Sequence, residues 1–126
     1  MRKTLFIFFI LISSLNVLKA QNTCQFQLEG TLGEQKITIC FYPDNDDGYV
    51  SGHYYYEEGR NGNLQLDGTA IYSKGLEGYY HRLTEYNSDG QITGYFIGTF
   101  KDEVMEGTWT NPSGNRSYHY RLELKK

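Results

Sequence analysis

The chain has 126 residues, of which 39% are hydrophobic and 21% are charged, and its formal net charge is −3. This length and composition suit one globular domain with a modest core. The lack of a basic excess argues against a nucleic-acid partner, because phosphate backbones attract surfaces rich in Lys and Arg. A cationic protein is a compatible partner, because complementary charges accelerate association.

The first twenty residues have the layout of a secretory signal peptide. A basic head, Met1-Arg2-Lys3, precedes an apolar run over 5–12, and the segment ends at the small residue Ala20. The run is too short to span a bilayer. We therefore expect a signal peptide over 1–20, a single β domain over 21–126, and a soluble exported protein, periplasmic or extracellular, whose mature chain does not insert into a membrane. The alternative is a retained amphipathic anchor. Cleavage would take the net charge from −3 to −6, since it removes three basic residues and no acidic ones.

Eight short segments rich in Tyr, Thr, Ile, Phe and Leu follow, separated by turns rich in Gly, Asn, Asp and Pro. They cover residues 24–29, 35–42, 49–57, 64–72, 76–86, 91–100, 104–110 and 115–124. No segment has an apolar pattern of helical period. Short connections favour antiparallel neighbours. The sequence thus predicts an all-β, antiparallel up-and-down meander of about eight strands that forms a closed or nearly closed small barrel.

The turns and the strand-interior glycines support this prediction. Asn61-Gly62 suits a two-residue hairpin loop, and the runs 87–90 and 111–114 each end a turn with Gly. Glycines inside strands commonly mark bulges or barrel corners. They recur at Gly52, Gly68, Gly78, Gly94, Gly98 and Gly107. We therefore expect a strongly curved sheet.

Cys24 and Cys40 are the only cysteines, and in an exported chain they are expected to form a structural disulfide. A three-residue turn over 31–33 would place Cys24 opposite Cys40. That register, however, separates Phe26 from the face that carries Ile37, whereas the apolar pattern brings them together. A bulge, or a position of Cys24 before the strand, would reconcile the two requirements.

Motifs for catalysis or metal binding are weak. The acidic run 43–48 does not match an EF-hand loop and reads as a solvated turn. His53, His81 and His119 come from three segments without the close spacing of zinc sites, and we expect them to be exposed or at a rim. No nucleophile has an evident base, and paired carboxylates lie at strand ends. We therefore expect no enzyme, no cofactor and no metal.

Tyrosine is the unusual feature, with 12 residues that include the run Tyr54–Tyr56 and the pair Tyr79-Tyr80. Consecutive strand residues point to opposite faces, so each run places rings on both sides of the sheet. One face can be core, and the other can recognise a ligand or partner, although tyrosines also serve simply as strand formers. The candidate binding residues are Tyr54, Tyr56, Tyr79, Tyr80, Tyr95, Trp109 and Tyr118.

Three resemblances bear on function. The stretch 107–114, Gly-Thr-Trp-Thr-Asn-Pro-Ser-Gly, resembles the Gly-x-Trp strand of avidin-type proteins and lipocalins, but on the seventh segment rather than the first. Residues 76–124 are similar to small, exported, functionally uncharacterised bacterial β-barrel or β-meander proteins. The loop 113–118 resembles the Ser-Gly-x-x-Tyr loop of bacterial lysozyme inhibitors and is one residue longer. The first resemblance implies a barrel for small hydrophobic ligands, and the last implies a protein partner.

The sequence therefore predicts an exported, non-catalytic binding protein that recognises a protein partner, of inhibitor or envelope type, through aromatic surface and loops. The alternative is a barrel that binds a small hydrophobic ligand. Its interior would then be lined by Phe96, Trp109, Tyr118 and Tyr120. We favour the first because bulky inward aromatics would fill the interior of an eight-stranded barrel.

Overall fold

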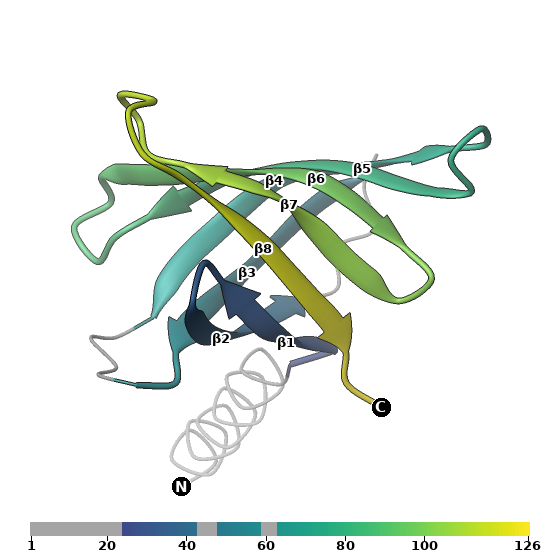
Figure 1. The fold of residues 1–126 in the computed structure, drawn as a ribbon, viewed down its shortest axis with the longest axis horizontal. Helices are drawn as coiled ribbons and strands as arrows, with labels where there is room; N and C mark the ends of the chain where they lie inside the picture. The colour runs from purple at the N-terminus through teal and green to yellow at the C-terminus, as the bar shows by residue number, and fades with distance from the viewer. Residues whose placement is uncertain (1–23, 43–47, 59–62) are drawn as a thin grey trace, which may run out of the picture.

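The computed structural model describes residues 24–42, 48–58 and 63–126, and over these it is an eight-stranded antiparallel barrel (Figure 1). The strands are β1 (Phe26–Leu32), β2 (Gln35–Tyr42), β3 (Tyr49–Tyr56), β4 (Leu64–Ser73), β5 (Gly78–Tyr86), β6 (Ile92–Lys101), β7 (Val104–Thr110) and β8 (Ser117–Leu124). They pair in sequence order, and β8 returns to β1 to close the barrel. The predicted fold class is confirmed. The signal peptide, most of the acidic run 43–48 and the Asn61-Gly62 turn lie outside the described residues.

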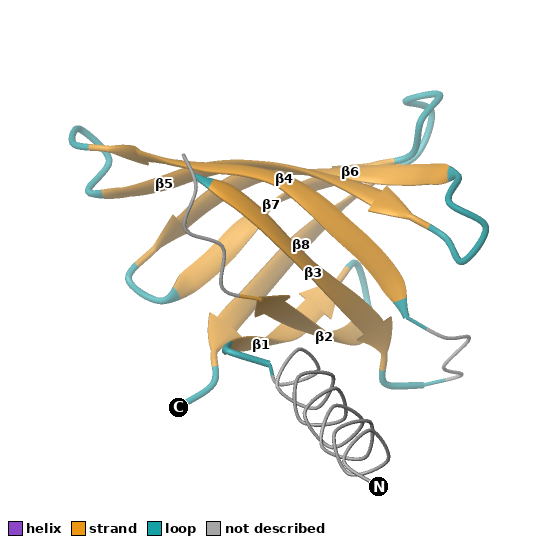
Figure 2. Ribbon diagram, turned by 180° about the vertical axis from the view of Figure 1, so that it is seen from behind, coloured by secondary structure: helices purple, strands orange, loops and turns teal. Residues whose placement is uncertain are grey.

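The barrel has two ends, seen from opposite sides in Figures 1 and 2. At the terminal end, on the right in Figure 1, β1 begins, β8 ends, and the connections β4–β5 and β6–β7 turn the chain. At the hairpin end lie the connections β1–β2, β5–β6 and β7–β8. The predicted turns over 87–90 and 111–114 are present, with Gly90 and Gly114 at φ of 79° and their amides bonded to the carbonyls of Asn87 and Asn111.

The first hairpin corrects the predicted register. β1 runs to Leu32 and the turn is Gly33-Glu34, so the three-residue turn over 31–33 is wrong. Leu28 lies opposite Ile39 and Gly30 opposite Ile37. The apolar pattern decides the register because a slip by one residue would turn the whole apolar set toward solvent.

The predicted disulfide is present and links the segment before β1 to a residue within β2. Cys24 precedes β1 and bonds to Cys40 with a Cα–Cα distance of 5.5 Å, so the expected position before the strand is confirmed. Disulfides persist in oxidising compartments, which fits a location outside the cytoplasm. Over the described residues, no helix has the length and apolar character needed to cross a membrane.

Apolar side chains at alternate positions of each strand point inward and form the core of the barrel. The inward positions of β8 are Tyr118, Tyr120, Leu122 and Leu124, as the sequence predicted. The buried apolar core comprises Leu28, Leu32, Ile37, Ile39, Tyr54, Leu66, Leu83, Phe96, Met105, Tyr120 and Leu122. Gly98 and Gly107 face each other across β6 and β7, and a Cβ at Gly107 would lie 2.6 Å from the Tyr120 hydroxyl. The same Cβ would lie 2.2 Å from the backbone oxygen of Ile97, so glycine is required there mainly by the close approach of the adjacent strand.

Candidate functional site

An apolar cavity of ≈540 Å³ occupies the terminal half of the barrel. It is within the volume range of small-molecule sites, which is about 300–1,000 Å³. Its lining comes from all of the strands, with one residue before β1 and one before β3. The lining residues are Gln25, Phe26, Leu28, Phe41, Tyr42, Gly48, Tyr49, Val50, Ala70, Tyr79, His81, Leu83, Phe100, Met105 and Leu124. None of them is Asp, Glu, Lys or Arg.

The lining grades from an exposed rim to a buried floor. Phe26 is 48% exposed, Tyr49 43% and Tyr79 42%, and these residues lie at or near the strand ends of the terminal end. The deep positions are buried: Leu28, Leu83, Met105 and His81. A molecule that enters from the terminal end would therefore meet aromatic side chains first and a largely aliphatic floor last.

His81 is the buried polar residue of this floor. It is 4% exposed, and its Nε2 lies 2.6 Å from the Tyr120 hydroxyl. Burial lowers the pKa of His81 to about 4, and burial also raises the pKa of Tyr120. Both side chains are therefore neutral at pH 7. The expectation that His81 is exposed or at a rim is wrong, because its position on β5 shares the inward face with Leu83.

Behind this pair, aromatic rings close the middle of the barrel. Phe96 packs edge-to-face on Tyr120 at 5.0 Å and on Tyr54 at 5.4 Å between ring centroids. All three rings are fully buried. Inward aromatic side chains thus fill the hairpin half of the barrel, as the sequence predicted for the whole interior, whereas the terminal half contains the cavity.

A buried carboxylate organises the hairpin half. Glu85 accepts hydrogen bonds from the Tyr54 hydroxyl at 2.5 Å, the Thr93 hydroxyl at 2.6 Å and the Trp109 indole N–H at 2.9 Å. Burial, and then the charge and hydrogen bond of Glu85, raise the pKa of Tyr54. Three neutral donors satisfy the carboxylate, so this cluster holds strands β3, β5, β6 and β7 in register and leaves no group free for a ligand.

The seven predicted binding residues occupy three different places. Four lie at inward positions of the hairpin half, namely Tyr54, Tyr56, Trp109 and Tyr118, and of these Tyr118 is 42% exposed at the end of the barrel. Two lie on the outward positions of β5 and β6, namely Tyr80 and Tyr95. One, Tyr79, lines the cavity. Trp109 stacks on Tyr118 at 5.8 Å and donates to Glu85, so the Gly-x-Trp stretch contributes to the closed half.

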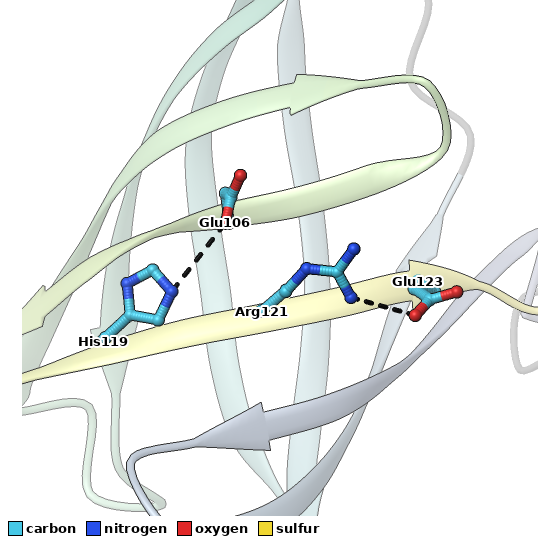
Figure 3. Close-up of polar contacts among 4 residues, drawn as sticks. All are labelled: Glu106, His119, Arg121 and Glu123. Atoms are coloured by element: carbon cyan, nitrogen blue, oxygen red, sulfur yellow. Dashed lines mark hydrogen bonds and ion pairs between the residues drawn. The ribbon is translucent and has the colours of Figure 1, made fainter.

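The three histidines do not converge. His53 lies on the outer side of β3 beside Tyr42, and His81 points into the barrel. His119 lies on the outer side of β8 near Glu106, at 3.8 Å (Figure 3). Figure 3 also shows Arg121 beside Glu123, at 2.9 Å. These pairs on the outer face are solvent-exposed, and such pairs contribute about 0–1 kcal/mol, so they stabilise the surface weakly and form no site.

The sequence reasoning did not identify Glu85, and it considered His81 only as a metal ligand or a rim residue. Both residues lie at alternate positions of β5 with Leu83 between them, so they share its buried face. The other face of the same strand, with Arg82 and Thr84, is about as polar. Alternation alone therefore could not show which face of β5 is buried.

Comparisons of the chain with protein-family models, with curated proteins and with solved structures find no match. Function is therefore inferred from the cavity and the chemistry of its lining.

Proposed function

We propose that the protein is a non-catalytic carrier or sensor that binds a small, largely apolar molecule in the terminal half of its barrel. The observation that supports this most directly is a ≈540 Å³ cavity whose lining contains no Asp, Glu, Lys or Arg. The closed hairpin half provides a rigid base, and the open half provides the volume. We therefore favour a small hydrophobic ligand over a protein partner. Inward aromatic side chains fill only the hairpin half of the interior, so they do not exclude a ligand from the terminal half.

The lining indicates the class of ligand. Burying apolar surface contributes roughly 25 cal/mol per Å², so a molecule that covers the aliphatic and aromatic lining gains affinity without any charged contact. A charged group would lose its hydration in this cavity and find no counter-ion. We therefore propose an uncharged or weakly polar ligand.

A fluorescent-probe titration tests this proposal. Trp109 lies in the closed half, so its own emission is a poor reporter, and the uncharged dye N-phenyl-1-naphthylamine is the better probe. Ala70 points into the cavity from β4, and its neighbour Thr69 points outward. We expect saturable, one-to-one dye binding to the wild type and to Thr69→Trp, and its loss in Ala70→Trp, which fills the cavity. Equal binding to both variants would place the dye elsewhere and refute the site.

A second candidate function uses the outer surface. Ile71 and Tyr80 are cross-strand partners on the outside of β4 and β5, and Ile97 lies nearby on β6. All three are exposed. We propose that this patch would recognise a protein, and the acidic net charge of the chain favours a cationic one. The test is stoichiometric capture of one exported protein by the wild type and its loss in Ile71→Ser/Ile97→Ser, with Thr108→Ser on the outer side of β7 as the control.

A further inference from the structure

The floor of the cavity has one polar side chain, His81. The hydrogen bond that His81 makes to Tyr120 determines which of its ring nitrogens remains for a ligand. Among the described residues that line the cavity, His81 is the one that is both polar and buried. Its Nε2 pairs with the hydroxyl of Tyr120 from β8, on the far side of Gly107. The state of this single pair therefore sets the polar chemistry at the inner end of the cavity.

The proton between the two side chains belongs to Tyr120. The Tyr120 hydroxyl is fully buried, and His81 is its one hydrogen-bond partner within the described part of the chain. If His81 donated from Nε2, the Tyr120 O–H would be left buried without an acceptor, which costs about 1–3 kcal/mol. Tyr120 therefore donates and His81 Nε2 accepts, so the neutral imidazole carries its proton on Nδ1.

By elimination, that Nδ1–H is accessible from the cavity. Nδ1 has no partner among the described residues, yet no buried side-chain nitrogen or oxygen of these residues lacks a partner. Nδ1 must therefore keep accessible surface, and His81 lines the cavity. The floor thus offers one directed donor in an otherwise apolar surrounding.

We propose that the cavity recognises an apolar molecule through an uncharged acceptor oxygen, such as a carbonyl, placed at the end of the molecule that enters first and bound by His81 Nδ1–H. This inference deepens the proposed function and depends on it. The Tyr120 hydroxyl acts as the positioning group, because it fixes the imidazole tautomer and ring orientation. The remainder of the ligand would extend past Leu83 and Met105 toward the aromatic rim.

An uncharged oxygen fits better than a carboxylate for two reasons. The lining supplies no Lys or Arg to compensate an anion. His81 resists protonation in its buried position, so it meets the ligand as a neutral donor rather than as a cation. A methyl ketone or an aldehyde accepts this hydrogen bond without placing a charge in the apolar cavity.

Competitive displacement of N-phenyl-1-naphthylamine by three eight-carbon molecules tests the proposal: 2-octanone, n-octane and octanoate. The quantity compared is the ratio of the dissociation constants of 2-octanone and n-octane. His81→Phe keeps an aromatic ring but removes the donor, and Thr108→Ser, on the outer side of β7 and away from the cavity lining, is the control. We expect the ratio to move against the ketone by about 3- to 10-fold in His81→Phe, the value of one neutral hydrogen bond, and to stay unchanged in Thr108→Ser.

The outcomes separate the two proposals. If ketone and alkane both bind, with the same ratio in wild type and His81→Phe, the hydrogen bond is refuted and the ligand cavity stands. If octanoate binds more tightly than 2-octanone, the uncharged oxygen is refuted. If neither the ketone nor the alkane displaces the dye, the proposed function fails together with this inference.

An infrared measurement on the wild type keeps the proposal testable if His81→Phe does not fold. Bound 2-octanone labelled with ¹³C at the carbonyl should show a stretch shifted to lower frequency than in hexane, because the carbonyl accepts a hydrogen bond. A stretch at the hexane position would refute the contact with His81.

Discussion

Replacing His81 with Gln should make the stability of the barrel less sensitive to acid. In the folded protein burial lowers the pKa of His81 from 6.5 to about 4. As the pH falls through 6.5, His81 becomes protonated in the unfolded chain, whereas in the folded chain it stays neutral until about pH 4. The contribution of neutral His81 is therefore complete above pH 6.5 and is lost as the pH falls toward 4. The full loss is about 3 kcal/mol, of which about 2 kcal/mol falls between pH 7 and pH 5.

Urea denaturation followed by circular dichroism at pH 7 and pH 5 measures this effect. Wild type should lose about 2 kcal/mol more unfolding free energy between the two pH values than His81→Gln does. All other ionisable groups are the same in both proteins, so the difference isolates residue 81. His119→Gln is the matched control, because it removes an exposed histidine on the outer face of the barrel. Equal losses in wild type and His81→Gln would show that His81 is accessible in the folded state and would refute the buried floor of the cavity.

Three further predictions concern stability, each measured as the free energy of unfolding in urea. Glu85→Ala should cost about 3–5 kcal/mol, because one buried donor, Tyr54, and two half-buried donors lose their acceptor. Glu106→Ala, at an exposed carboxylate, should change stability by less than about 1 kcal/mol, and similar losses in the two variants would refute the buried cluster. Gly107→Ala should cost about 1–3 kcal/mol, since its Cβ would lie 2.2 Å from a backbone oxygen of the adjacent strand, and an unchanged midpoint would contradict that packing. Replacing Cys24 and Cys40 with Ser should cost roughly 3 kcal/mol from loop entropy, and no change would show that the bond does not constrain the unfolded chain.

Much of the fold was predictable because its determinants are local. Turn residues meet dihedral requirements within four positions, and alternation along a strand is visible over a few residues. The segments 35–42 and 104–110 therefore coincide with β2 and β7. Short connections then leave few topologies for eight strands, and the antiparallel meander is the simplest of them.

The register of the first hairpin depends on the apolar faces of both strands and not on the turn residues alone. The turn residues by themselves favour a turn over 31–33 with Gly at its end. The structure instead extends β1 to Leu32 because Leu28 and Ile39 must face the same interior. A turn can shift by a residue at small cost, whereas a shifted apolar face exposes a whole strand.

The amino-acid sequence by itself determined an all-β meander, its turns and its pair of cysteines, because each of these depends on residues close together or on residue type alone. Only the tertiary structure decided where the aromatic rings meet and where they leave space. Closing β8 onto β1 brings the rings of Tyr120, Phe96 and Tyr54 into contact, so the hairpin half is filled. The terminal half keeps a cavity with His81 at its floor. Free volume is a property of the closed barrel, since it depends on side chains from all eight strands at once.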